Sequence, residues 1–360
     1  MKVFFIPYDR NGNNPYQKLL LNYLQKLGVE IEDGGTCAFT LLRSTFSYWK
    51  LDILHLHWHH PFLLGSNMRK TITNSISFIT VLLMLKLLGV KIVWTMHNIV
   101  SHERNFESLE LFFSKCLTKL CNKIIVHSLS AKNNVINIYR VSESLITIIQ
   151  HGHYISYYEN EITKAQAKNK LQLKPGKIVF LFFGGIRHYK GVPELVEAFE
   201  KLNSSQANLL IAGEPFNNEI ANDILKRCKE NENIETFLEF IPEDDIQTYM
   251  NAADVVVLPY RDFLTSGAVI LAMSFSKPVI VPSIGCMLDV LDNKGSIMYD
   301  PSKKEGLLKA MKKTFGADLK RMGEHNFELA KQFRWDEIAK KTYEIYIGCL
   351  KRNIKKELAK

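Results

Sequence analysis

Two glycines, an arginine and a lysine follow an apolar run in the middle of the chain. Residues 184–191 read Gly-Gly-Ile-Arg-His-Tyr-Lys-Gly, between the strand-like run 178–183 and a helix-like run that opens at Pro193. Glycines after a strand let the backbone approach a ligand, and the first turn of a helix offers free N–H groups. Arg187 adds a forked donor and Lys190 a point charge, so we expect a diphosphate here. An ordinary glycine turn with two solvated cations is the alternative.

A second junction of the same kind lies at residues 258–267. It reads Leu-Pro-Tyr-Arg-Asp-Phe-Leu-Thr-Ser-Gly, and its last three residues, Thr265, Ser266 and Gly267, lie where a helix should begin. Their hydroxyls and backbone amides suit a phosphate or a sugar, although helix capping alone would also explain them. Two such junctions in one half of the chain favour the binding of a nucleotide diphosphate.

The first half of the chain offers polar residues at two predicted strand ends. His97 follows the strand-like run 90–94, where an ordinary structural hydrogen bond is the alternative to a functional role. Gly12 and Asn13 lie in the loop after the first predicted strand. Because Gly12 has no Cβ, we assign it to the diphosphate; we assign Asn13 to the acceptor side, and an ordinary polar turn remains the alternative.

Residues 55–60, His-Leu-His-Trp-His-His, support two interpretations. Histidines two apart at a strand end can bind zinc, so a metal-dependent hydrolase is one alternative function. The histidines that it would use are His55, His57, His59 and His60. Asp52 is the only acidic residue nearby, and no complementary motif supplies further ligands. The other interpretation places His57 and Trp58 on the acceptor side, with the indole stacked on a sugar.

Short apolar strands and helix-length segments alternate along the chain, which predicts parallel sheets covered by helices. The strands are expected at residues 2–7, 51–56, 90–94, 123–126, 145–149, 178–183, 207–212, 255–258 and 278–281. Residues 159–177 are polar and lysine-rich, as in a connection between domains. We therefore expect a first domain at residues 1–160 and a second at 161–337, with a helix at about 338–360 packed back on the first.

These motifs resemble the retaining glycosyltransferases of the GT-B fold, most closely family four, also called group 1. The resemblance covers nearly the whole chain and rests on residues 184–199, 253–259, 267–278 and 333–336 in that order. It implies an α/β protein in which two Rossmann-like domains, each a doubly wound parallel sheet, face a cleft. Such sheets bind ligands beyond the carboxyl ends of their strands.

The resemblance also implies a role for individual residues. The donor diphosphate would be held by Gly185, Arg187 and Lys190, the donor phosphate and sugar by Thr265, Ser266, Gly267 and Ala268, and the base by Ile241 and Pro242. His97 would act catalytically, near the transferred sugar. The chain departs from the family at Phe263 and Leu271, where glutamates are usual, and at Gly185, where the arginine usually stands.

The function expected from this resemblance is transfer of a hexosyl unit from a nucleotide-diphosphate sugar to a saccharide or polyprenyl-linked acceptor. The transfer would retain the anomeric configuration and serve polysaccharide or glycoconjugate biosynthesis. No metal or cofactor is expected, because Arg187, Lys190 and the helix N-termini would neutralise the leaving diphosphate. A non-catalytic protein that binds sugar nucleotides is the alternative, motivated by the two missing glutamates.

The composition restricts the partners and the compartment. The net charge of +9 suggests an anionic partner, and residues 1–160 hold 16 Lys and Arg against 10 Asp and Glu. Basic residues without interleaved aromatic residues do not predict nucleic-acid binding. Six cysteines without a CxxC pair and no signal peptide predict reduced thiols in a cytoplasmic protein.

The most apolar window of the chain, residues 76–90, is interrupted by Lys86 and is shorter than the ~20 residues of a spanning helix. It predicts a helix packed on a sheet. Peripheral attachment to an anionic membrane, at the inner face of the plasma membrane, is the alternative.

Overall fold

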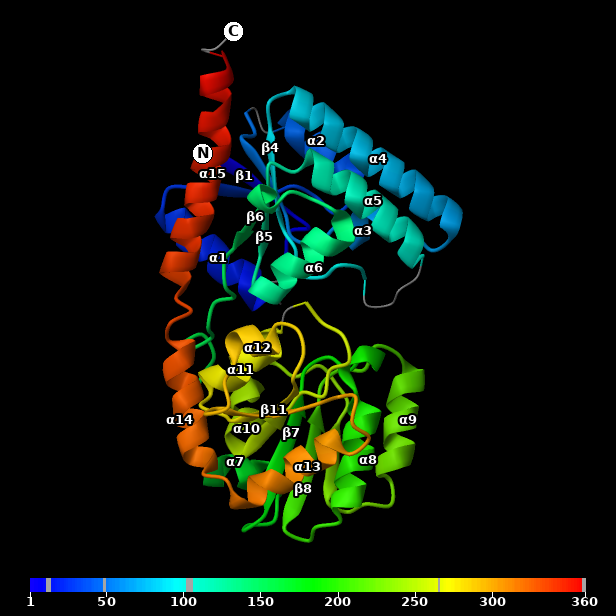
Figure 1. Ribbon diagram of the computed structural model, residues 1–360, viewed down its shortest axis with the longest axis vertical. Helices are drawn as coiled ribbons and strands as arrows, with labels where there is room; N and C mark the ends of the chain where they lie inside the picture. The colour runs from blue at the N-terminus through cyan, green and yellow to red at the C-terminus, as the bar shows by residue number, and fades with distance from the viewer. Residues whose placement is uncertain (11–13, 48–49, 102–105, 265, 358–360) are drawn as a thin grey trace. The chain divides into compact units, whose positions relative to one another are not determined.

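The chain folds into two compact units (Figure 1). The computed structural model describes residues 1–10, 14–47, 50–101, 106–264 and 266–357. The first unit consists of Met1–Gly152 together with Arg334–Lys360, and the second of His153–Phe333. The sequence had placed these two boundaries a few residues later, near 160 and 337. Gly12, Asn13 and Thr265, which the sequence assigned to the site, lie outside the described residues.

The first unit is built on one parallel sheet with the strand order β2-β1-β3-β4-β5-β6. Its strands are β1 (Lys2–Ile6), β2 (Glu30–Asp33), β3 (Ile53–Leu56), β4 (Lys91–Thr95), β5 (Lys123–Val126) and β6 (Ile146–Ile148). The central strands β3 and β4 are buried along their whole length. Parallel strands need crossover connections, and helices supply most of them.

The helices of this unit include one from the far end of the chain. They are α1 (Pro15–Lys26), α2 (Ala38–Ser47), α3 (His60–Leu63), α4 (Met68–Leu87), α5 (Glu107–Leu120), α6 (Leu129–Tyr139), the 3₁₀ turn η1 (Glu143–Leu145) and α15 (Trp335–Glu357). Helix α15 packs against α1 (Figure 1). Trp335 and Tyr346 of α15 are buried in one apolar cluster with β1 and α1, so the last helix completes the core of the first unit.

The second unit repeats this architecture with the strand order β12-β11-β10-β7-β8-β9, again parallel. Its strands are β7 (Ile178–Phe183), β8 (Ala207–Ala212), β9 (Ile234–Phe237), β10 (Val255–Val257), β11 (Val279–Pro282) and β12 (Ser296–Tyr299). Its helices are α7 (Lys164–Lys170), α8 (Val192–Leu202), α9 (Asn218–Cys228), α10 (Ile246–Ala252), α11 (Gly267–Ser274), α12 (Met287–Val290), α13 (Gly306–Lys313) and α14 (Leu319–Ala330), with the 3₁₀ turns η2 (His188–Lys190), η3 (Glu243–Asp245) and η4 (Thr314–Gly316).

Both sheets reverse their strand order next to their first strand. In the first unit the reversal lies between β1 and β3, and in the second it lies between β7 and β10. At such a point the two following loops turn to opposite sides and leave a crevice beyond the carboxyl ends of the strands. The fold therefore places the loops after β7 and β10, and those after β1 and β3, where a ligand is expected.

The apolar window at residues 76–90 proves to be part of a longer helix than the sequence suggested. Helix α4 has 20 residues and is long and apolar enough to cross a membrane, judged by length and composition alone. One third of its most apolar segment is buried inside the structure. The estimate from sequence that this segment falls short of a spanning length was wrong, because the helix begins eight residues earlier, at Met68.

Candidate functional site

The loop after β7 carries the arginine and the lysine of the second unit. Gly184 has φ +117°, a conformation that side chains disfavour, and Gly191 has φ +69° where it caps the N-terminus of α8. Between them, Arg187 leads into the 3₁₀ turn η2, which ends at Lys190. The loop thus presents two cations at the carboxyl end of the strand, immediately before a helix N-terminus.

The loop after β10 packs directly on this segment. A Cβ on Gly191 would lie 2.2 Å from the carbonyl oxygen of Pro259, so only glycine allows the two backbones to come so close. The backbone N–H of Arg261 donates to the Tyr189 carbonyl at 2.7 Å. The two junctions singled out in the sequence therefore meet at the point where the sheet reverses its order.

The Lys190 ammonium lies in a partly desolvated position at this junction. It stands 5.5 Å from the centre of the Tyr260 ring, and Tyr260 is buried. Desolvation, and secondarily the charge of Arg187, lowers the pKa of Lys190 to about 8. Two adjacent cations in a partly desolvated position attract negative charge, so this pair is suited to an anion such as a diphosphate.

Phe216, which the sequence analysis missed, supports Arg187. The guanidinium carbon of Arg187 lies 4.3 Å from the centre of the Phe216 ring. The loop after β8 that carries Phe216 is tied to the loop after β7 by hydrogen bonds on both sides of Ile186, from Ile186 N to Glu214 O and from Phe216 N to Ile186 O. The phenylalanine therefore restricts the orientation of the arginine.

The N-terminus of α11 completes this edge of the second unit. Ser266 is the N-cap residue, and its hydroxyl accepts a hydrogen bond from the backbone N–H of Val269 at 3.4 Å. A side-chain hydrogen bond also joins Ser266 to Tyr260. Gly267 and Ala268 are half-buried in the first turn, which presents free N–H groups. This arrangement agrees with the capping role and leaves the helix terminus available to a phosphate.

The remaining predicted residues of this unit differ in exposure. Gly185 is exposed beside the cations, whereas Leu271 is buried in α11. Ile241 is buried and Pro242 exposed, in the segment after β9 that leads into η3. Phe263 packs against Tyr260 with ring centres 5.7 Å apart. The two positions where glutamates are usual therefore hold side chains that pack against neighbouring apolar groups.

A histidine follows each of four neighbouring strands in the first unit. These residues are His57 after β3, His97 after β4, His127 after β5 and His151 after β6, and all four are buried. Tyr16 of α1 stands among them, with its ring centre 4.9 Å from that of His97 and 5.0 Å from that of His151. The sequence analysis recognised His97 and His57 but missed the cluster, because its members are far apart in the chain.

Burial keeps these imidazoles neutral. Desolvation lowers the pKa of His127 to about 4 and that of His151 to about 3, and the pKa values of His57 and His97 lie well below the usual 6.5. Neighbouring histidines lower the pKa of His97 further. A neutral imidazole has one donor and one acceptor nitrogen, so its hydrogen bonds determine which nitrogen donates and which accepts.

A chain of hydrogen bonds assigns the acceptor nitrogen of His97. The Nδ1 of His127 lies 2.8 Å from the Ile149 carbonyl, which can only accept, so His127 donates from Nδ1. Its Nε2 then accepts from His97 Nδ1 at 3.4 Å. No residue that the structure describes hydrogen-bonds His97 Nε2, which is left as a buried acceptor. It is suited to a ligand hydroxyl.

His57 and Trp58 lie beside His97. The Trp58 and His97 rings stack with centres 4.5 Å apart, and the His57 and His55 rings stack at 4.3 Å. Neither ring nitrogen of His57 has a hydrogen-bond partner in the described part of the chain. Polar atoms buried in this way are costly unless a ligand or water satisfies them. The half-buried Trp58 is part of an aromatic group, as a sugar-binding surface requires.

The geometry does not support the metal hydrolase. His55 uses both ring nitrogens in hydrogen bonds, to the hydroxyls of Tyr346 at 2.5 Å and Thr95 at 2.7 Å. His59 turns instead toward the buried carboxylate of Glu110, 3.4 Å away. Among the residues that the structure describes, no group of three or more His, Cys, Asp or Glu side chains could hold a metal ion.

Glu110, another residue that the sequence analysis missed, fixes the segment that follows His97. Its carboxylate accepts hydrogen bonds from the backbone N–H of Ser101 at 2.7 Å and from the Ser101 hydroxyl at 2.8 Å. Burial raises the pKa of Glu110, but the neighbouring His59 imidazole and the hydrogen bonds from Ser101 outweigh it, so the net shift is downward. The ionised carboxylate thereby anchors the start of this loop to α5.

Comparison with known proteins identifies the family of the second unit. Residues 177–316 match the family model of glycosyl transferases group 1. The second unit carries a group 1 glycosyltransferase domain. The resemblance inferred from the motifs is thereby confirmed at the level of the family; the matched segment contains both junctions, with Arg187, Lys190 and Ser266.

One relative extends the similarity beyond this domain. A GDP-mannose:glycolipid 4-beta-D-mannosyltransferase of Xanthomonas campestris pv. campestris is 27% identical over 282 residues, which cover 78% of this chain and 73% of that protein. The chain is thus similar to a glycosyltransferase across both units, and a transferase activity is supported.

Solved structures agree on the fold. Sucrose-phosphate synthase from Thermosynechococcus elongatus superimposes with a TM-score of 0.76 at 16% identity, over 96% of this chain and 98% of that chain. Anabaena HepE in complex with UDP-glucose gives 0.75 at 14% identity, over 96% and 98%. At this identity the likeness concerns the fold alone, and the expected GT-B fold with two Rossmann-like sheets is confirmed.

The buried histidines make the first unit sensitive to acid. Their folded pKa values lie below the value of about 6.5 in an unfolded chain, so below that pH the unfolded chain binds protons that the folded chain does not. Their contribution to the free energy of unfolding is complete above about pH 6.5. As the pH falls below this value, each histidine loses about 1.4 kcal/mol of that contribution per pH unit. We expect denaturant titrations to give a markedly smaller free energy of unfolding at about pH 5.5 than at about pH 7.5. Equal values would contradict the neutral cluster.

Proposed function

We propose that the protein transfers a hexosyl unit from a nucleotide-diphosphate sugar to a hydroxyl of a saccharide or lipid-linked saccharide. The observation that carries this proposal is the meeting of Arg187, Lys190 and the α11 N-terminus where the sheet of the second unit reverses its order. A leaving diphosphate gains negative charge as the bond to the sugar breaks, and oriented cations stabilise that charge. Because they neutralise it, we propose transfer without a metal ion.

The mannosyltransferase relative suggests the first substrates to test. Its name specifies GDP-mannose and a glycolipid, so we propose GDP-mannose as donor and a lipid-linked saccharide as acceptor. In the first unit, His97 Nε2 would accept a hydrogen bond from a sugar hydroxyl, and Trp58 beside it would stack on a sugar ring. A role in polysaccharide or glycoconjugate biosynthesis follows from these substrates.

The family resemblance supports retention of the anomeric configuration, which we propose as the stereochemical course. The acceptor oxygen would attack the anomeric carbon on the face from which the diphosphate leaves, and a phosphate oxygen would take the acceptor proton. Phe263 and Leu271, in place of the usual glutamates, do not enter this step. Arg187 and Lys190 would hold the diphosphate beside the attacking hydroxyl.

Inversion is a second candidate course, with two observations in its favour. The two glutamates usual in the retaining family are replaced by Phe263 and Leu271. The mannosyltransferase relative is named for a β product, and a β product from an α-linked nucleotide sugar requires inversion. In that course the acceptor attacks opposite the leaving diphosphate, and the neutral His97 Nε2 takes its proton.

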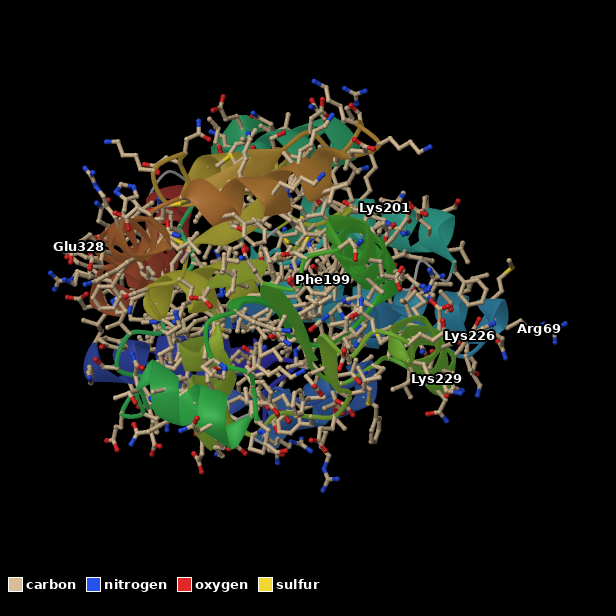
Figure 2. All side chains as sticks on the ribbon, turned by 90° about the horizontal axis from the view of Figure 1, so that it is seen from below. Arg69, Phe199, Lys201, Lys226, Lys229 and Glu328 are labelled. Carbon is tan, nitrogen blue, oxygen red and sulfur yellow. The ribbon has the colours of Figure 1, made fainter. Side chains whose placement is uncertain are left out.

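The diphosphate site can be tested with three variants. We expect Arg187→Ala to lower kcat by about 10² to 10³, as the loss of one such donor does elsewhere. Phe216→Ala should lower it by about tenfold, since it only frees Arg187 to move, and Phe216→Tyr should restore it. The control is Lys226→Ala, an exposed cation of the same unit that extends from α9 (Figure 2). Steady-state kinetics measure kcat for each variant. An unchanged kcat in Arg187→Ala would contradict the assignment of Arg187 to the diphosphate.

The lowered pKa of Lys190 predicts a pH dependence of nucleotide binding. Below about pH 8 the ammonium form predominates and binds a nucleoside diphosphate fully. As the pH rises through about 8 the free protein loses this proton, and the affinity should fall by up to about tenfold per pH unit. Calorimetric titration with GDP and UDP measures this. Lys190→Ala should bind weakly without this dependence.

A matched lysine controls for general effects of pH. Burial also lowers the pKa of Lys277 to about 8, but its ammonium donates to the Ala253 carbonyl at 3.1 Å, away from the site. The dependence should therefore persist in Lys277→Gln. Affinity that is flat across this pH range in the wild type would contradict a role for Lys190.

The anomeric configuration of the product distinguishes the two courses. We expect an α product from an α-linked donor, read from the anomeric proton coupling by NMR. Under retention, His97→Gln should lower kcat by about tenfold to a hundredfold, because an amide can replace the hydrogen bond in part. A β product would overturn retention. Together with loss of activity in His97→Gln, it would establish the histidine as a base.

A further inference from the structure

Helix α4 has two apolar sides, and only one of them packs on the first unit. Phe78, Leu82 and Leu85 are buried, at helical spacing, toward the rest of the unit. Ile76, Leu83 and Leu87 are spaced by seven and four residues, which places them on the opposite side of the helix. They are 54%, 47% and 88% exposed, so the second apolar side is uncovered.

The neighbouring helices carry further exposed apolar side chains. Helices α2 and α5 both pack against α4, which runs along the outside of the first unit (Figure 1). Phe39 and Phe46 of α2 are 73% and 67% exposed, and Phe112 of α5 is 60% exposed. Large exposed apolar side chains in such numbers mark an interaction surface rather than scattered exposure. We call the exposed apolar residues of these three helices the α4 face.

The charges around the α4 face are mostly positive. The exposed basic residues of the three helices are Arg43, Arg69, Lys70, Lys86, Lys115 and Lys119. Residues 38–47 and 68–87, which form α2 and α4, contain no Asp or Glu. Helix α5 contains two acidic residues, the half-buried Glu107 and the buried Glu110. The uncovered leucines and phenylalanines are thus accompanied by cations with few carboxylates to oppose them.

We propose that the α4 face docks the protein on an anionic lipid surface. Leucine and phenylalanine side chains would enter the boundary between headgroups and acyl chains, and the lysines and arginines would pair with lipid phosphates. The helix lies on the surface and does not cross the bilayer, because its other side is fixed in the core of the unit by Phe78, Leu82 and Leu85. This goes beyond the transfer reaction and does not depend on it.

A second copy of the chain is a poorer occupant than lipid. In a symmetric dimer the same patch meets itself, so the cations of one copy would face a patch that is also rich in cations. Like charges that meet across an interface weaken the binding, and protein interfaces are depleted in lysine. An anionic lipid surface satisfies both the apolar side chains and the charges.

Flotation of the purified full chain with vesicles tests the proposal. The vesicles contain either phosphatidylcholine alone or phosphatidylcholine with phosphatidylglycerol, at low and at high salt. The wild type should float with the anionic vesicles, less at high salt and little with the neutral ones. Leu83→Asp/Leu87→Asp should reduce partitioning roughly a hundredfold, because two leucines no longer bury their side chains.

Matched controls separate the α4 face from general surface effects. Leu129→Asp/Ile138→Asp changes two residues of α6 in the same unit, 54% and 45% exposed, and should float like the wild type. Arg69→Glu/Lys70→Glu should weaken partitioning by at least about 25-fold, at roughly fivefold for each cation. Lys226→Glu/Lys229→Glu reverses two exposed cations of the second unit and should have a far smaller effect (Figure 2).

Several results would overturn the docking proposal. They are absence of flotation by the wild type, equal flotation with both kinds of vesicle, equal losses in the face and control variants, or a wild-type dimer that Leu83→Asp/Leu87→Asp converts to monomer without change in flotation. Thermal unfolding verifies that each variant is folded. The charge-reversal pair affects exposed residues only, so it remains informative if the aspartate pair fails to fold. Binding of nucleoside diphosphate to the variants in solution should be unchanged.

Discussion

The candidate site of the second unit depends on the close contact between Gly191 and Pro259. The backbone of Gly191 lies so near the Pro259 carbonyl that any Cβ would collide with it. This contact joins the loops after β7 and β10, and it brings the end of η2 against Tyr260. Gly213 serves the neighbouring pair of loops in the same way, since its Cβ would lie 2.3 Å from the Gly184 carbonyl. Three loops are thus fixed together, and the two cations take their positions from them.

The carboxyl ends of the strands have different electrostatic environments in the two units. In the second unit, adjacent cations raise the positive potential at a partly desolvated position, and the pKa of Lys190 is lowered as a result. In the first unit, the histidines are neutral because they are buried together with Tyr16 and one another. A charged diphosphate requires the former environment, whereas the hydroxyl groups of a sugar require hydrogen-bond donors and acceptors without charge. The same strand architecture therefore presents two kinds of chemistry.

The sequence predicted the strands that lie inside the sheets and missed three of the four at the edges. Apolar runs such as residues 178–183 and 207–212 are buried on both faces, and their pattern is unmistakable. The strands β2, β9 and β12 occupy sheet edges. With sequences Glu-Ile-Glu-Asp, Ile-Glu-Thr-Phe and Ser-Ile-Met-Tyr, they are short and partly polar. Their strand character comes from pairing with a neighbour, which a local pattern does not contain.

The same reasoning explains which parts of the candidate site the sequence contained. Arg187 and Lys190 were recognisable because glycines, cations and a helix start lie within eight residues of one another. Phe216 and Tyr16 contact residues that are distant from them in the chain, so no local spacing in the sequence indicates their roles. The hydrogen-bond chain from Ile149 through His127 to His97 illustrates this limit, because it joins the ends of three strands. A single histidine in the sequence could have been structural, but its acceptor nitrogen is defined only once the neighbouring rings and the carbonyl are placed in space.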